Sequence, residues 1–560
     1  MDFKEQIVTL LVKETGLAKE EIERMVVVPP DPKLGDYAFP CFKLGKNPKE
    51  AAEKLQKQIK LPHFLSKIEV AGPYLNFFVN QSLLTEQTLK AIATQKATYG
   101  SGKSRKNIVL EFCSPNTNKP LHLGHIRNMS LGDALGKVIS FQGATVHPVE
   151  IVNDRGVHIC KSMLAYQRWG NEKKPDKKSD HFVGDYYVLF AKKAKEDPAL
   201  EEAAQKMLLA WEQGDKEVRA VWKKMNKWVL DGFSQTYKRF GIKFEKEYYE
   251  SQLYLLGKDI VMDGLRRGIF VKDKKGAVIA PLEKEGLTNK VVLRADGTSV
   301  YITQDLYLAQ KRFEDFHFDE MIYVTATEQN LAFKQLFRVL ELLKRPYAGK
   351  LVHFSYGMVN LPSGRMKSRE GTVVDADDLI DEVSALALSE VEKRYTTLSL
   401  VEKKRRAECI ALGAIKFFML RTDAVRDIIF NPEESLSFEG ETGPYLQYTH
   451  ARACSILRKA GKVSGKVNYN FFKEDSELRL VKLLTDFPLK VKEAADHHKI
   501  HVLCRYLLDL AQSFNEFYHA VQVISDEKKV MKARLVLVDA VRQVLANGLG
   551  CLGIEALEEM

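Results

Sequence analysis

The spacing of apolar and polar residues divides the chain into regions of different character. From residue 107, apolar runs rich in β-branched and aromatic residues alternate with helical segments, which predicts parallel strands joined by crossover helices. These runs read NIVLEFC, VHPVEIVN, VVLRA, SVYIT, EMIYVTA and LVHFSYGMV. A stretch at about 165–285 interrupts the rhythm with charged helices, so we interpret it as an insertion. The middle of the chain is therefore predicted to be a doubly wound, Rossmann-like α/β domain.

The two ends of the chain show other patterns. The N-terminal region mixes short helices with the strand-like run GPYLNFFVN, which predicts an α+β domain. Its first residues form an amphipathic helical pattern without the apolar block of an export signal. From about residue 376 helical periodicity continues to the last residue, which predicts an all-α region. The predicted parts are 1–100, 101–375 with the insertion, a helical connector at 376–440, and an all-helical domain at 441–560.

Composition narrows the class of protein. A chain of 560 residues that is 45% hydrophobic can build several packed domains, and no apolar run reaches the roughly 18 residues that a membrane span needs. The seven cysteines are scattered, with neither a C-x-x-C pair nor a cluster at zinc-ligand spacing, so we expect a reducing cytoplasm and no dedicated metal site. The net charge of +11 is compatible with nucleic-acid binding and equally with solubility.

One short stretch carries the most specific chemistry. In NIVLEFCSPNTNKPLHLGHIRN a strand hands over to a helix, and His122, Gly124 and His125 lie at the start of that helix. Ligands bind at the carboxyl ends of parallel strands, and a helix N-terminus offers free N–H groups to an anion. The two histidines are three residues apart and can reach the same phosphate oxygens, while the glycine leaves room for a base or ribose. The pattern predicts a nucleoside triphosphate site, and alone it leaves a nucleotidylyltransferase open.

Several motifs together resemble a known family. SPNTNKPLHLGH is similar to the HIGH signature of class I aminoacyl-tRNA synthetases, and its opening with Lys119 is similar to the arginyl-tRNA synthetases in particular. Comparable blocks follow in the same linear order over nearly the full length. They are VNDRG, RADGTSVYITQD, FDEMIYVTATEQ, ETGPYLQYTHAR and GLGCLGIEALEEM. The resemblance implies a class I synthetase fold with a C-terminal anticodon-binding domain.

The resemblance also implies a reaction. Arginine and ATP, with Mg²⁺ accompanying the ATP, would form arginyl-adenylate, and arginine would then pass to the 3′ terminal adenosine of tRNA(Arg). Such an enzyme is an ATP-dependent, AMP-forming arginine-tRNA ligase, expected to act as a monomer. A synthetase-like nucleotidylyltransferase and a non-catalytic tRNA-binding paralogue are the alternatives.

Residues for recognising arginine follow from the same resemblance. A guanidinium is planar and permanently charged, so a selective pocket needs carboxylates and polar acceptors in a fixed arrangement. The positions that match arginine-binding residues of the family are Ser114, Asn116, Glu250, Tyr301, Asp305 and Gln329. Tyr301 and Asp305 are four apart and share one face if a helix begins there. Each residue alone could instead be a solvated polar group or part of an internal ion pair.

The second signature of the class, K-M-S-K-S, is degenerate here. Its counterpart lies in SGRMKSREGTVV, where Ser368 takes the place of the second lysine. The resemblance assigns ATP binding to Met366, Lys367 and Ser368, beside His122, Gly124 and His125. We predict that Lys119 carries part of the missing lysine's role, so the catalytic residues would be His122, His125, Lys119 and Lys367. The alternative is a basic surface loop.

RNA-facing residues are the least specific part of this interpretation. The C-terminal helices contain DAVR, which resembles the run that names the family's anticodon-binding domain. Unstacked bases are read by aromatic and arginine side chains, so Tyr448, Arg452 and the chain end at Met560 are candidates for tRNA binding. Leu557 departs from the proline that is common in the family. In the N-terminal domain Asn76 is the candidate that matches a tRNA-facing position.

Overall fold

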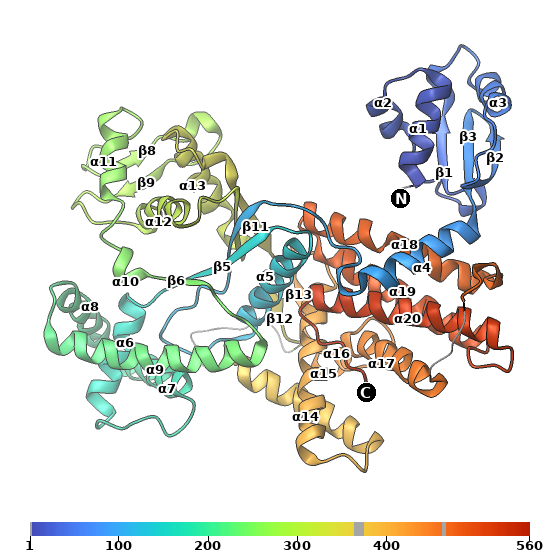
Figure 1. The fold of residues 1–560 in the computed structure, drawn as a ribbon. Helices are drawn as coiled ribbons and strands as arrows, with labels where there is room; N and C mark the ends of the chain where they lie inside the picture. The colour runs from blue at the N-terminus through green and yellow to red at the C-terminus, as the bar shows by residue number, and fades with distance from the viewer. Residues whose placement is uncertain (1–2, 363–373, 462–465) are drawn as a thin grey trace. The chain divides into compact units, whose positions relative to one another are not determined.

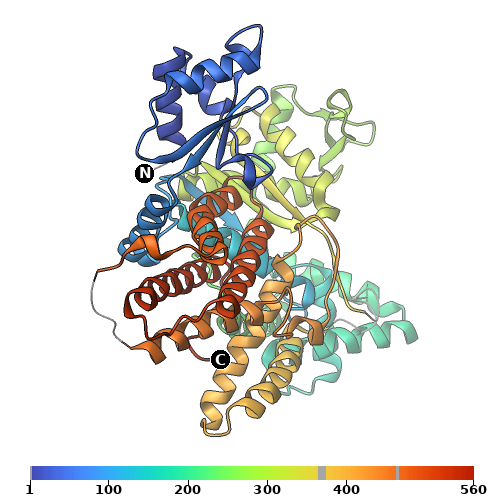
Figure 2. The same cartoon turned by 90° about the vertical axis from the view of Figure 1, so that its right-hand side faces the viewer.

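The structure is a computed structural model that describes residues 3–362, 374–461 and 466–560 (Figures 1 and 2). By packing, the chain divides into two compact units. The first comprises Met1–Tyr99, Arg452–Phe487 and Leu510–Leu545, and the second comprises Gly100–Ala451, Pro488–Asp509 and Ala546–Met560. The described part of the chain contains no helix with the length and apolarity that a membrane crossing requires.

The N-terminal region is α+β, as the sequence predicts. Its sheet has the order β1-β3-β2 and is antiparallel throughout. The strands are β1 (Tyr37–Pro40), β2 (Leu65–Ala71) and β3 (Tyr74–Val79), and the helices are α1 (Phe3–Thr15), α2 (Lys19–Met25), α3 (Pro48–Gln58) and α4 (Gln81–Gln95). Asn47 and Asn80 begin α3 and α4, because each side chain accepts a main-chain N–H of the first turn.

The second unit contains a five-stranded parallel sheet of the order β11-β10-β4-β5-β6. Its strands are β4 (Asn107–Glu111), β5 (Thr145–Val152), β6 (Lys246–Tyr249), β10 (Glu320–Ala326) and β11 (Leu351–Tyr356). From β4 the chain moves first towards β5 and later returns to β10 on the other side, so the strand order reverses between β4 and β10. The predicted doubly wound fold is confirmed, and its switch point lies beside the histidine motif.

Helices cover the sheet and provide its core. α5 (Leu123–Phe141) follows β4, and α12 (Tyr301–Phe316) and α13 (Asn330–Leu342) flank β10 in the chain. One hydrophobic core joins sheet residues Val109, Val149 and Met321 to side chains of α12 and α13. Burial of such apolar surface is the main stabilisation of this layer.

Two features of the middle region differ from the sequence prediction. VVLRA supplies β9 (Lys290–Leu293), which pairs with β8 (Val278–Ala280), and β8 pairs in turn with β7 (Val271–Lys272), so the three form a separate antiparallel sheet. SVYIT is the start of α12 and not a strand, because Thr303 accepts the N–H of Val300 (3.0 Å) and closes the first turn. Short apolar runs do not distinguish strand from helix by periodicity.

The predicted insertion is largely helical but is not a single block. Four helices, α6 (Val157–Trp169), α7 (Ser179–Glu196), α8 (Ala199–Glu212) and α9 (Lys216–Phe240), form the group at the lower left of Figure 1. β6 follows them and pairs with β5 in the parallel sheet. Next come α10 (Glu250–Leu253) and α11 (Lys258–Arg266). The chain therefore returns to the parallel sheet, through β6, in the middle of the predicted insertion.

The last third of the chain is helical, as predicted. It contains α14 (Ala376–Arg394), α15 (Leu400–Leu420), α16 (Pro432–Ser435), α17 (Gly443–Ala460), α18 (Asp475–Asp496), α19 (Ile500–Ala520) and α20 (Lys528–Cys551). Figure 2 shows α14 and α15, in light orange, as an adjacent pair. The expectation that strands end by residue 376 is wrong in one detail, because β13 (Ile428–Ile429) pairs with β12 (Val359–Asn360).

Candidate active site

The histidine motif forms the N-terminus of α5 at the switch point of the sheet. His122 is the N-cap residue, and its Nδ1 accepts the N–H of Gly124 (3.1 Å). His125 Nδ1 accepts the N–H of His122 (3.0 Å), which completes a reciprocal capping box. Because each Nδ1 is an acceptor, a neutral ring carries its proton on Nε2. The hydrogen bonds therefore assign both rings as Nε2–H donors.

Burial keeps these imidazoles neutral. It lowers the pKa of His122 to about 3, with Lys119 adding to the shift, and it lowers the pKa of His125 well below the ordinary value. The ring centroids are 3.9 Å apart. A side chain at Gly124 would crowd this arrangement, because an added Cβ would lie 3.0 Å from the ring of His122. Glycine at position 124 thus avoids a tight contact with the ring of His122.

Lys119 lies in the loop before these histidines and is partly buried. Burial lowers the pKa of its ammonium group, and Asp375 partly reverses that shift. The remaining predicted ATP-binding residues, Met366, Lys367 and Ser368, fall outside the described residues. The next described residue, Val374, lies beside the histidine motif, because its carbonyl accepts the N–H of Leu123 (3.1 Å).

Two of the predicted arginine-binding carboxyls influence each other electrostatically. Glu250 begins α10 after β6, and Asp305 lies in the second turn of α12. Burial raises the pKa of Glu250 to about 7, although Arg155, whose Nη1 is 3.7 Å from Glu250 Oε1, opposes the shift. Burial, with Glu111 and Glu250 adding to it, raises the pKa of Asp305 to about 7. A site that holds two buried carboxyls with raised pKa values is suited to a cationic ligand.

The other predicted arginine-binding residues are spread along the strand ends. Tyr301 is the first residue of α12 and its side chain is 81% exposed, and Gln329 is exposed just after β10. Asn116 is exposed and its backbone pairs with Asn153. Ser114 has a left-handed backbone (φ +49°), and its buried Oγ has no hydrogen-bond partner among the described residues. Such an orphaned hydroxyl is available to a ligand.

The predicted tRNA-binding residues differ in accessibility. Tyr448 is partly exposed and packs edge to face on Phe438. Arg452 donates to Asn515 Oδ1 (2.8 Å). Asn76 in β3 is 3% exposed and Met560 is 9% exposed, so neither presents its side chain to a ligand in this conformation.

Several residues that sequence reasoning passed over support the site. In VNDRG, a block noted only for its resemblance, Asp154 accepts the N–H and the Oγ–H of Ser251 (2.7 and 2.6 Å), which fixes the start of α10. Arg155, which belongs to the same motif as Asp154, forms an ion pair with Glu250. Arg312 and Glu111 form a buried ion pair, and the charges of both act on Asp305. Sequence alone could not distinguish this buried charge pair from an exposed one.

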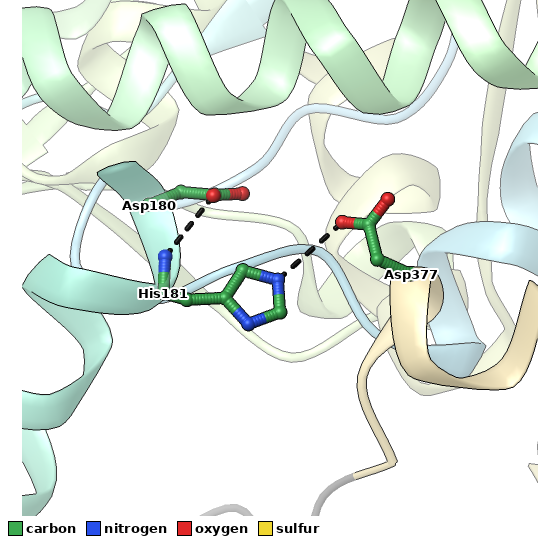
Figure 3. A group of neighbouring side chains, drawn as sticks. All are labelled: Asp180, His181 and Asp377. Atoms are coloured by element: carbon green, nitrogen blue, oxygen red, sulfur yellow. Dashed lines mark hydrogen bonds and ion pairs between the residues drawn. The ribbon is translucent and has the colours of Figure 1, made fainter. Parts of the chain in front are cut away.

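One cluster in the described residues could hold a cation, namely Asp180, His181 and Asp377 (Figure 3). Figure 3 shows the ring of His181 directed towards Asp377, while its main-chain N–H donates to Asp180 (3.0 Å). Lys178 Nζ lies 2.8 Å from Asp180 and 2.7 Å from Asp377. The lysine ammonium therefore already supplies the positive charge that a metal ion would bring.

Comparison with known proteins matches three family models along the chain. They are an arginyl tRNA synthetase N terminal domain over residues 2–79, the catalytic domain of class I (R) tRNA synthetases over 88–432, and a DALR anticodon binding domain over 446–560. Curated relatives described as arginine--tRNA ligase include one from Treponema denticola, 44% identical over 97% of both chains, and one from Parabacteroides distasonis, 42% identical over 93% of this chain and 92% of the other. The solved structure of Thermus thermophilus arginyl-tRNA synthetase is 28% identical, covers 99% of both chains and superposes with a TM-score of 0.84.

Proposed function

Because this chain belongs to the class I arginyl-tRNA synthetases, we propose that it activates arginine with ATP and transfers it to tRNA(Arg). In the first step a carboxylate oxygen of arginine attacks the α-phosphorus, the bond to the bridging oxygen of the β-phosphate breaks, and pyrophosphate leaves. In the second step a ribose hydroxyl of the terminal adenosine attacks the carbonyl carbon of arginyl-adenylate, and AMP leaves. ATP enters as its magnesium complex, so the ion is part of the substrate.

The observation that carries the proposal is the pair of neutral imidazoles at the start of α5. Their capping hydrogen bonds leave Nε2–H of His122 and His125 as donors, and burial holds them neutral. We propose that these donors stabilise the charge that develops on the phosphates during adenylate formation. Lys119 supplies a point charge beside them.

The substrate arginine is held by groups on the other strand ends. Glu250 and Asp305 face the guanidinium, because two carboxyls with raised pKa values gain most from a permanent cation. Ser114, whose Oγ is orphaned, and Asn116 meet the amino end, while Tyr301 and Gln329 close over the side chain. Met366, Lys367 and Ser368 complete the proposed ATP site.

The rest of the chain serves the tRNA. We propose that the parts at 1–100 and 441–560 bind tRNA, that 101–375 catalyses the reaction, and that 376–440 connects the two. Tyr448 and Arg452 are the candidates for direct base contact, whereas the buried Asn76 and Met560 contribute by shaping the surface. We propose that the protein acts as a monomer in the cytoplasm. Its seven cysteines are free thiols, which agrees with a reducing compartment.

Arginine-dependent exchange of labelled pyrophosphate into ATP, with and without tRNA, tests this function. We expect exchange with arginine and none with citrulline, which has the same shape but no charge. Exchange that needs no amino acid would indicate a nucleotidylyltransferase. Binding of tRNA without any exchange would indicate a non-catalytic paralogue.

A further inference from the structure

Two chain segments far apart in the sequence run antiparallel beside the phosphate-binding histidines. The N–H of Leu123 donates to the carbonyl of Val374 (3.1 Å), and the N–H of Ala376 donates to the carbonyl of Leu121 (2.9 Å). His122 and Asp375 are the bridged pair between these bonds. We call residues 121–123 and 374–376 the signature seam, because it joins the first signature to the chain that follows the second. A shift of residues 374–376 would therefore move the first signature.

The first turns of α7 pack against the loop that feeds this seam. Gly184 in α7 lies on the loop, because an added Cβ would be 2.7 Å from Cδ of Pro120 and 3.7 Å from Cα of Lys119. Such a distance leaves no space for any side chain at Gly184. The backbone that carries Lys119 thus rests directly on α7.

Polar groups at the start of α7, with Thr236 of α9, hold Asp377, the residue that directly follows the other segment of the seam. Asp377 Oδ2 accepts from Lys178 Nζ (2.7 Å) and Thr236 Oγ1 (3.0 Å), and it lies 3.4 Å from His181 Nε2. The other ring nitrogen of His181 lies 3.5 Å from a carboxylate oxygen of Asp375 (Figure 3 shows the ring).

α9 packs closely against this charged cluster. Asp180 is fully buried, and Gly232 in α9 makes room for it, since a Cβ there would be 2.4 Å from its Cγ. Arg239 Nη1 approaches the second oxygen of Asp377 to 4.0 Å. Buried ion pairs add little net stability because desolvation offsets their attraction, but they hold one register well. A register role is thus the natural reason for this cluster.

We propose that the first two turns of α7 are a positioning element for adenylate formation. His181 of α7, with Asp377 of α14, holds the signature seam, and Gly184 of α7 seats the backbone of Lys119 near the histidines. His181 and Asp377 are positioning residues, since they act through Asp375 and the loop rather than on a substrate. The inference rests on the proposed function. Its consequence is that damage to the cluster slows chemistry, because displacement of reacting groups by about 1 Å costs on the order of 10²-fold in rate.

Asp377→Asn, with Asp378→Asn as the matched control, tests the proposal. Asp378 is the next residue of the same helix, and its side chain is exposed. In arginine-dependent pyrophosphate exchange we expect Asp377→Asn to lower kcat at least about 10-fold while the KM for arginine stays near that of the parent, because Glu250 and Asp305, the proposed partners of the guanidinium, lie on α10 and α12. Asp378→Asn should match the parent in both constants.

Two variants of His181 provide a second test, which still decides the question if Asp377→Asn does not fold. His181→Phe removes both ring nitrogens, whereas His181→Gln keeps a donor for Asp377. We expect kcat to fall in the first variant and to recover in the second, and Gly184→Ala should also lower kcat by moving Pro120. If His181→Phe keeps the parent's kcat and only its melting temperature falls, the cluster is merely structural and the inference is overturned. If the parent itself shows no arginine-dependent exchange, the proposed function fails instead.

Discussion

At the scale of single residues, the two carboxyls of the proposed arginine site are partly protonated near neutral pH. Glu250 and Asp305 each have a pKa raised to about 7, in both cases chiefly by burial. A bound guanidinium favours the ionised carboxylates and so lowers both pKa values in the complex. Binding of arginine must then release protons whenever the empty pocket holds them.

This linkage predicts that arginine binds more tightly as pH rises. The carboxyls bind more protons in the free enzyme than in the complex, so the affinity for arginine increases from about pH 6 to about pH 8 and levels off above both free pKa values. Calorimetry at pH 7 in two buffers of different ionisation enthalpy should count about one proton released, since two groups are each about half protonated. Glu250→Gln should release fewer. An affinity independent of pH would contradict the assignment.

A second prediction at this scale concerns the two lysines near the triphosphate. Lys119 is partly buried and lies close enough to His122 and His125 to lower their pKa values. We expect Lys119→Ala to slow adenylate formation strongly and Lys367→Ala to slow it less, as measured by single-turnover rates with saturating ATP. The reverse ranking would assign the role of the missing signature lysine to Lys367.

At the scale of elements, α5 has an unusual beginning. Helix N-caps are commonly Ser, Thr, Asp or Asn, whereas here His122 fills the position with Nδ1 and keeps Nε2 for a ligand. One side chain thus serves the fold and the chemistry at once. A mutation to alanine therefore mixes two effects, and only a residue that caps without an imidazole can separate them.

We predict that His122→Asn and His122→Ala differ in stability but not in activity. Asparagine can still cap α5, so its melting temperature should stay near the parent's, while alanine loses about 1 kcal/mol of helix capping. Both variants should form adenylate roughly 10²-fold more slowly, because both lack the Nε2–H donor. Thermal unfolding and exchange kinetics check the two halves separately. Full activity in His122→Asn would mean that this histidine only caps the helix.

At the scale of the whole molecule, we predict that activation of arginine requires tRNA. An RNA that contacts separate parts of the chain favours the conformation that it binds most tightly. If that conformation is also the one that activates arginine, this difference in affinity couples tRNA binding to activation. Pyrophosphate exchange should appear with tRNA(Arg), including tRNA whose terminal adenosine cannot accept arginine. The comparison needs constant ionic strength, since a protein of net charge +11 binds RNA in a salt-dependent way. Exchange at full rate in RNA-free enzyme would exclude the coupling.

Features of short range could be read from the sequence. The strand, loop and helix around His122 and His125, and the placement of Tyr301 and Asp305 one helical turn apart, depend on local periodicity. The order of the motifs indicated the family and with it the doubly wound fold. Where periodicity was ambiguous the prediction failed, as for SVYIT, whose short apolar run begins a helix.

Only the tertiary structure decided which distant residues meet and how strongly water is excluded from them. It brings Glu250 and Arg312 close enough to Asp305 to influence its pKa, and it sets His181 against Asp375 and Asp377 across almost 200 residues of sequence. The neutral state of the histidines and the raised pKa values of the carboxyls are products of this burial. Sequence spacing specifies neighbours along one element, whereas burial and register arise from packing between elements, which no local pattern encodes.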